Sequence, residues 1–134
     1  MVSTIRAGLN KMQLPKKDIS NRTEIELLMK TFYESLLTNE EIKPVFAHTN
    51  FEVHMPHIVS FWSFVLLDEE GYKTNVFDKH VNLPIKEEHF EIWLNHFEAT
   101  VNNLFSGEKA ELAKLRAQTI AYTFKEKLRA MGKF

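Results

Sequence analysis

Residues 86–106 constrain the fold most, because their apolar side chains follow the period of one helical face. They recur at spacings of three, four and seven residues, at Phe90, Trp93, Leu94, Phe97, Val101, Leu104 and Phe105. This pattern predicts a long amphipathic helix. Pro84 precedes it, and a residue before proline avoids helical backbone angles, so we expect Leu83 to form an extended corner. The sequence therefore places His80, on the short segment 78–83, directly before an aromatic helical wall.

The same period predicts three further helices and no strand. One begins near Asn21, which has the capping-box spacing to Glu24, and it should bury Ile25, Leu28, Met29, Phe32 and Leu36. Another follows a loop at 47–50, with Pro56 in its first turn, and should bury Ile58, Val59, Phe61, Trp62, Val65 and Leu66. The last begins after a break at Gly107, and its stripe consists of Ala110, Ala113, Ala117, Ile120, Ala121, Phe124 and Leu128. We expect one all-α domain at 18–134, preceded by a basic N-terminal extension at 1–17.

Composition excludes several classes of function. The chain has no cysteine, so zinc–thiolate sites, iron–sulfur clusters, disulfides and cysteine nucleophiles are ruled out. Its formal net charge is -1, which does not favour nucleic acid or a membrane surface as a partner. No apolar run approaches the roughly 18 residues of a membrane span, and motifs for zinc proteases, calcium loops and phosphate loops are missing. We expect a soluble, cytoplasmic protein that is a monomer, with a dimer as the alternative.

Histidine is the residue type in this chain that could supply metal ligands, but spacing alone does not show which histidine binds a metal. His54 and His57 are three residues apart and could share a metal, but no carboxylates follow at ligand spacing. An iron triad built from His89, Glu91 and His96 would need side chains on different faces of a helix. A single histidine is more often a surface or packing residue than a ligand, so spacing does not by itself assign His80.

Six pieces of sequence, in this order, resemble the truncated haemoglobins of group III. Across residues 18–128 they are TFYESL at 31–36, IKPVF at 42–46, HMPHIVSFWSFVLL at 54–67, KHVNLP at 79–84, HFEIWLNHF at 89–97 and RAQTIAYTF at 116–124. Paired glycine motifs around the early helices are absent, which speaks against group I. The resemblance implies a truncated globin fold, which is a two-over-two helical sandwich around haem.

The resemblance also implies roles for particular residues. His80 matches the proximal histidine that ligates the haem iron, and Tyr33 and Trp93 match residues that face the bound ligand on the distal side. His54 matches the distal gate, and His57 occupies a position that often carries a cation for a haem propionate. The apolar pocket residues it implies are Phe46, Ile58, Phe61 and Trp62. Because the chain has no cysteine, the haem would be held without thioether bonds, as haem b.

Two functions follow from the resemblance, beside a helical interaction domain without any cofactor. The first is a haem protein that reversibly binds oxygen, nitric oxide and carbon monoxide and removes nitric oxide or reactive oxygen and nitrogen species. Nitric oxide dioxygenase or peroxidase-like chemistry would need an external reductase, because the chain has no flavin or nicotinamide motif. The alternative is a globin-fold sensor or binding module without catalysis. Fold-level resemblance does not decide between the two.

Overall fold

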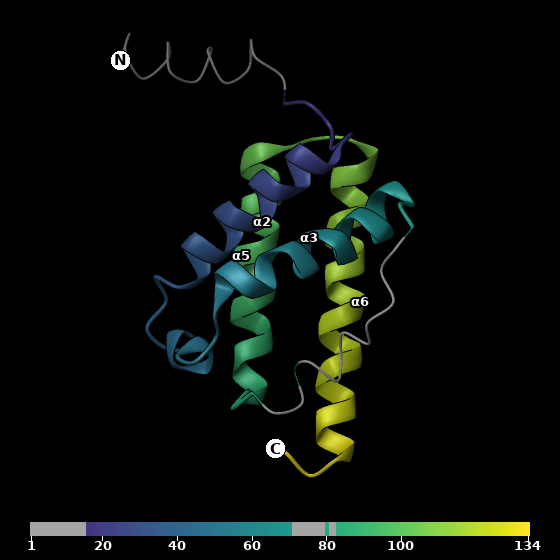
Figure 1. Cartoon of the computed structure of the whole chain (residues 1–134). Coiled ribbons are helices and arrows are strands. Elements are labelled where there is room, and N and C mark those ends of the chain that lie inside the picture. Colours follow the sequence, from purple (N-terminus) through teal and green to yellow (C-terminus); the bar gives the residue numbers. More distant parts are fainter. Residues whose placement is uncertain (1–15, 71–79, 81–82) are drawn as a thin grey trace, which may run out of the picture.

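The computed structural model describes residues 16–70, 80 and 83–134 (Figure 1). Its elements are α2 (Arg22–Leu36), the short 3-10 helix η1 (Lys43–Phe46), α3 (Phe51–Leu67), α5 (Glu87–Leu104) and α6 (Glu108–Ala130). Every element in these ranges is helical, which confirms the predicted all-α class. Most of the predicted N-terminal extension lies outside the described residues, and so does the predicted histidine segment apart from His80 and Leu83.

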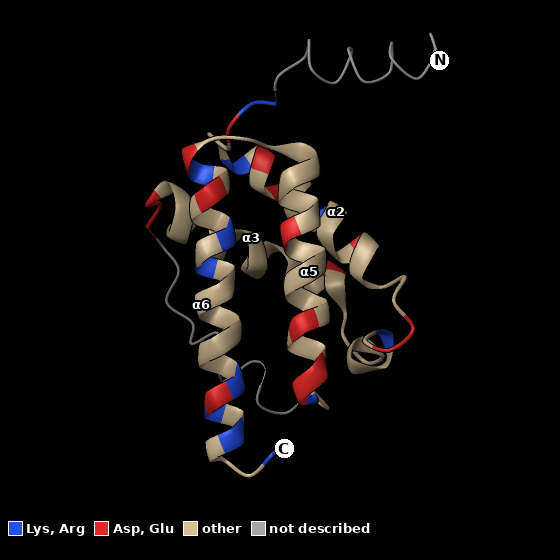
Figure 2. Cartoon of the chain, turned by 180° about the vertical axis from the view of Figure 1, so that it is seen from behind, with Lys and Arg blue, Asp and Glu red and all other residues tan. Residues whose placement is uncertain are grey.

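The helices form two layers of two. The pair α2 and α3 crosses in front of the pair α5 and α6 in Figure 1, and the order is reversed from behind in Figure 2. Within the layers α2 packs on α3 and α5 on α6, while α2 also packs on α5 and α3 on α6. This is the predicted two-over-two sandwich. None of the helices in the described part of the chain combines the length and apolar character that a membrane crossing requires.

The apolar stripes predicted for α2 and α6 lie where the layers meet. All five stripe residues of α2 are buried, and the N-cap Asn21 accepts a hydrogen bond from the Glu24 backbone N–H at 2.9 Å. Four alanines of α6 are buried and let α5 approach closely. By contrast, Trp93 and Phe90 of α5 and Phe124 of α6 are only partly buried. Their exposed faces line the cavity described below, which explains why these three side chains are not fully buried.

The predicted start of α3 is wrong by more than a turn. Asn50 is the N-cap, because its side chain accepts hydrogen bonds from the backbone N–H groups of Glu52 and Val53 at 3.1 and 3.4 Å. Pro56 therefore lies inside the helix and not in its first turn. The capping side chain determined the start, whereas proline only permits one. As a result His54 is a helical residue of α3.

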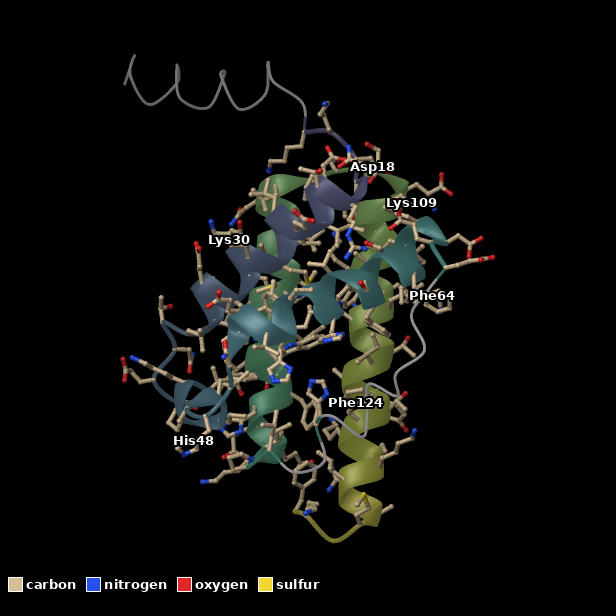
Figure 3. All side chains as sticks on the ribbon, viewed as in Figure 1. Asp18, Lys30, His48, Phe64, Lys109 and Phe124 are labelled. Carbon is tan, nitrogen blue, oxygen red and sulfur yellow. The ribbon has the colours of Figure 1, made fainter. Side chains whose placement is uncertain are left out.

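A carboxylate distant in sequence caps the start of α6. Gly107 precedes the helix with φ 136°, a conformation that favours glycine, and a Cβ there would lie 2.6 Å from Cγ of Asp18. The space is needed because the Asp18 carboxylate accepts hydrogen bonds from the N–H groups of Lys109 and Ala110, at 2.8 and 2.9 Å (Figure 3). Burial acts to raise the pKa of Asp18, but these bonds and one from Ile19 outweigh it and lower the pKa.

Replacing Asp18 by alanine should lower the free energy of unfolding by about 1–2 kcal/mol, because two helix N–H groups lose their acceptor. The lowered folded pKa gives the ionised carboxylate a stabilising effect above its unfolded pKa of about 3.9. That effect is lost as the pH falls through the folded value. Urea unfolding at neutral pH and below pH 4 would measure both, with Asp18→Asn as the matched control without charge. An unchanged midpoint in Asp18→Ala would contradict the capping role.

Candidate cofactor pocket

One cavity of about 410 Å³ opens between the two layers. Its size lies within the roughly 300–1,000 Å³ of pockets that hold small molecules and cofactors. The structure brings together at its walls all nine residues for which the sequence resemblance implied a role. They come from α2, η1, α3, α5 and the segment before α5: Tyr33, Phe46, His54, His57, Ile58, Phe61, Trp62, His80 and Trp93.

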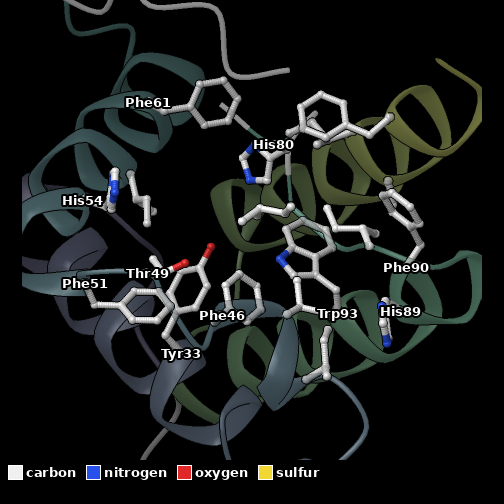
Figure 4. A pocket seen from close by; sticks show the side chains of 18 of the residues that line it. Tyr33, Phe46, Thr49, Phe51, His54, Phe61, His80, His89, Phe90 and Trp93 are labelled. Carbon is white, nitrogen blue, oxygen red and sulfur yellow. The ribbon is translucent and has the colours of Figure 1, made fainter. Parts of the chain in front are cut away.

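His80 lies on one side of this cavity and the side chains of Tyr33 and Trp93 lie on the other (Figure 4). The His80 ring packs against Phe124 of α6, with ring centroids 5.3 Å apart. Its backbone carbonyl accepts a hydrogen bond from the Leu83 N–H at 3.1 Å, which ties His80 to the corner that leads into α5. The imidazole is therefore supported from behind and presented to the open space.

Aromatic neighbours fix the orientations of Tyr33 and Trp93. The Tyr33 ring contacts Phe51 and Phe46 at centroid distances of 5.1 and 6.2 Å. Trp93 stacks on Phe97 at 5.6 Å with an interplanar angle of 14°. Both rings thus have little freedom, and they turn a hydroxyl and an indole N–H toward each other and toward the cavity (Figure 4). These two groups form a polar patch in an otherwise apolar wall.

Burial raises the pKa of Tyr33 to about 12, and the hydrogen bond with the Trp93 side chain acts in the opposite direction. The phenol is therefore neutral throughout the physiological range and keeps its hydrogen. An indole N–H can only donate, and the Trp93 N–H faces the Tyr33 oxygen, while the Tyr33 hydrogen remains available for another acceptor. An acceptor placed in the cavity could receive that hydrogen.

The remaining walls are those of a site for a flat apolar molecule. Trp62 stacks on Phe97 at 4.9 Å, and Phe61 meets Trp62 edge to face at 5.6 Å. Ile58 and Phe46 complete the wall formed by α3 and η1. In the described ranges no three His, Cys, Asp or Glu side chains come together to hold a bare metal ion. A macrocycle that brings its own metal ligands needs only one imidazole from the protein, so these residues fit a haem.

His54 and His57 occupy the rim. Both are exposed and both line the cavity from the N-terminal turns of α3. No Lys or Arg lines the cavity in the part of the chain that the structure describes. Among the described residues that line the cavity, these two imidazoles are the exposed side chains that can carry positive charge.

Sequence reasoning missed several wall residues. Thr49 places a hydroxyl beside that of Tyr33 (Figure 4), and it is held by its N–H bond to the Phe46 carbonyl at 3.0 Å. A lone threonine in a loop carries no pattern that could have revealed it. Phe51 supports Tyr33, and the aromatic pair Phe46 and Phe51, whose centroids are 5.7 Å apart, is visible only after the chain turns between them. Phe124 was predicted as a core residue and instead supports His80.

A two-layer helical sandwich with one imidazole facing a tyrosine and a tryptophan across an apolar cavity defines a globin-like protein. The chain matches the family model of the bacterial-like globins over residues 17–126. It is 32% identical over 124 residues to the group 3 truncated hemoglobin ctb of Campylobacter jejuni, covering 87% of this chain and 98% of that protein. A crystal structure of the group III truncated hemoglobin from Campylobacter jejuni matches with a TM-score of 0.76 and 33% identity, over 84% of this chain and 94% of that one.

The chain thus belongs to the bacterial-like globin family, as a truncated haemoglobin of group III. The predicted family and fold are confirmed, and membership implies that the chain binds haem and diatomic gases.

Proposed function

We propose that this globin holds one haem b in the cavity, with His80 as the ligand of its iron, and that it binds oxygen, nitric oxide and carbon monoxide reversibly. The observation that carries the proposal is the placement of His80 opposite the Tyr33 and Trp93 donors across an apolar cavity. The absence of cysteine supports a non-covalent haem. When bound, the haem would supply an iron centre for gas binding and for one-electron chemistry.

The other wall residues would contact the haem, a flat apolar disc with charged propionates at one edge, in different ways. Phe46, Ile58, Phe61 and Trp62 would pack on its apolar faces and exclude water. His57, exposed at the rim, would face a propionate and favour its charge when protonated. Tyr33 and Trp93 would donate hydrogen bonds to a small ligand on the side away from His80. Together these contacts bind, orient and shield the ligand.

We propose further that the physiological task is removal of nitric oxide or related reactive nitrogen and oxygen species, with electrons from a separate reductase. The supporting feature is the pair of donors Tyr33 and Trp93, since two donors retain a partly negative ligand long enough for reaction. A carrier that must release oxygen readily gains nothing from such a pair. The sequence contains no flavin or nicotinamide motif of its own, so the reductant must come from elsewhere.

The absorption spectrum of the reduced protein, with and without carbon monoxide, tests the haem proposal directly. A Soret band that shifts on adding carbon monoxide supports it, and a colourless chain after incubation with haem refutes it. The catalytic proposal needs a second measurement, in which the oxygenated protein receives nitric oxide and an excess of reductant. Consumption of many equivalents supports turnover. Consumption of a single equivalent would point instead to the sensor or binding module.

His54 should control ligand entry more than ligand retention, because it is exposed on α3 at the rim and is not enclosed beside the donors. In His54→Leu the association rate of carbon monoxide should rise roughly fivefold, which corresponds to about 1 kcal/mol for one polar contact at the barrier. Its affinity should change less, since exit is eased as well. Flash photolysis measures the rate, with His48→Leu as the control, an exposed histidine outside the cavity wall. An unchanged rate with weaker binding would make His54 a direct partner of the ligand.

A further inference from the structure

The residues after α6 turn back toward the start of α5. Gly132 adopts φ 76°, a left-handed conformation, and its N–H donates to the Arg129 carbonyl at 3.0 Å. The N–H of Lys133 donates to the Leu128 carbonyl, also at 3.0 Å. These two bonds make a Schellman motif, which ends the helix and reverses the chain. Figure 1 shows the result, in which the chain leaves the lower end of α6 and runs toward the lower end of α5.

The reversal places Phe134 in a small cluster with Glu87, Phe90 and Arg129, which we call the C-terminal clasp. The Phe134 ring meets the Phe90 ring edge to face, with centroids 6.2 Å apart. The Arg129 guanidinium carbon lies 5.7 Å from the centre of the Phe134 ring, as in a cation–π contact. Arg129 also forms an ion pair with Glu87 in the first turn of α5. The clasp therefore joins the end of α6 to the start of α5 by apolar and charged contacts.

Phe90 connects the clasp to the cavity. Its side chain lines the cavity on the α5 side (Figure 4), while Phe134 packs against it. Phe134 remains 39% exposed, so one part of its ring packs on Phe90 while the rest faces solvent. Without Phe134, Phe90 would lose an aromatic neighbour and could swing away from the cavity. The helix that carries Phe90, α5, begins only seven residues after His80 in the sequence.

We propose that Phe134, held by Arg129, is a positioning residue for the cofactor: it keeps Phe90 against the cavity and so slows the escape of haem at this edge. The inference rests on the proposed haem site and extends it to residues outside the cavity wall. Neither Arg129 nor Phe134 lines the cavity. Their effect must therefore pass through Phe90 and the start of α5, and it should show in cofactor retention before it shows in ligand chemistry.

The test is the rate of haem transfer to an excess of haem-free myoglobin, followed by the Soret absorbance. Phe134→Ala should release haem about tenfold faster than the wild type, the size expected for losing one aromatic pair and one cation–π contact. Phe134→Trp should release haem as slowly as the wild type, because the larger ring can fill the same place. Met131→Ala is the matched control, since Met131 is an exposed apolar side chain of the same segment outside the clasp.

A second control separates local opening from general destabilisation. Asp18→Ala weakens the opposite end of α6, so urea unfolding of the haem-free chains gives a common scale for both variants. Faster release in Phe134→Ala than in Asp18→Ala at comparable stability supports the proposal. Equal release from Phe134→Ala and the wild type overturns it, and so does release that simply follows the unfolding midpoint. A wild-type chain that takes up no haem overturns the proposed function as well, which the spectrum shows before any rate is measured.

Discussion

Replacing His80 by alanine should remove the iron–imidazole vibration from the resonance Raman spectrum and weaken haem binding more than about a hundredfold. Loss of a residue that merely supports a metal ligand costs about 10–100-fold in affinity, so loss of the ligand itself should cost more. Haem binds only the folded chain, and at 100 times its Kd it would stabilise the wild type by about 2.7 kcal/mol. Most of this stabilisation should vanish in His80→Ala. Haem titration and thermal unfolding with and without haem measure the two effects.

The choice among the cavity's histidines can be decided by matched variants. His57→Ala removes another imidazole from the same cavity, and it should keep the vibration because His57 lies at the exposed rim. His80→Gly should recover the wild-type spectrum when imidazole is added to the solution, since the free ring can occupy the vacated space beside Phe124. If His80→Ala retains both the vibration and the wild-type affinity, a different residue ligates the iron.

Removing one of the two distal donors, Tyr33 or Trp93, should accelerate oxygen release about ten- to a hundredfold unless the other donor compensates. Dioxygen bound in this cavity would carry partial negative charge on its outer atom, and a hydrogen bond to a charged acceptor contributes roughly 1.5–3 kcal/mol. Each 1.4 kcal/mol corresponds to tenfold in the equilibrium. Stopped-flow oxygen release from Tyr33→Phe, Trp93→Phe and the double variant would measure it. Carbon monoxide is less polar when bound, so its release should change much less.

The structure adds an expectation about how the two donors are coupled. Because the Trp93 N–H faces the Tyr33 oxygen, Trp93→Phe should change Tyr33 as a donor as well as removing the contact of Trp93 with the ligand. The effects of the two single variants should therefore not add. Since burial raises the pKa of Tyr33 to about 12, the wild-type release rate should not change with pH in the neutral range. Wild-type release rates in all three variants would show that both rings only pack.

The helical periods in the sequence were sufficient to predict the four long helices of the fold, but not the short 3-10 helix η1. The buried stripe of α2, the alanine stripe of α6 and the break at Gly107 each depend on residues close together in the chain. Local patterns of this kind report which face of a helix is apolar. They failed at the start of α3: the pattern predicts Pro56 in the first turn, whereas the helix capped by the Asn50 side chain begins five residues before Pro56. The sequence contains both helix-start signals, Asn50 and Pro56, and only the structure showed that the helix begins at the Asn50 cap.

The candidate site depended on a different kind of information. The sequence by itself determined that an all-α domain carries a histidine before an aromatic helix, and resemblance suggested which residues would meet. Only the tertiary structure brought Tyr33, His80 and Trp93, which are 60 residues apart at the extremes, to opposite sides of one cavity. It alone revealed Thr49 beside Tyr33, Asp18 at the start of α6 and Phe134 behind Phe90. Such contacts join residues distant in the chain, and no local period encodes them, because they arise where separate helices pack.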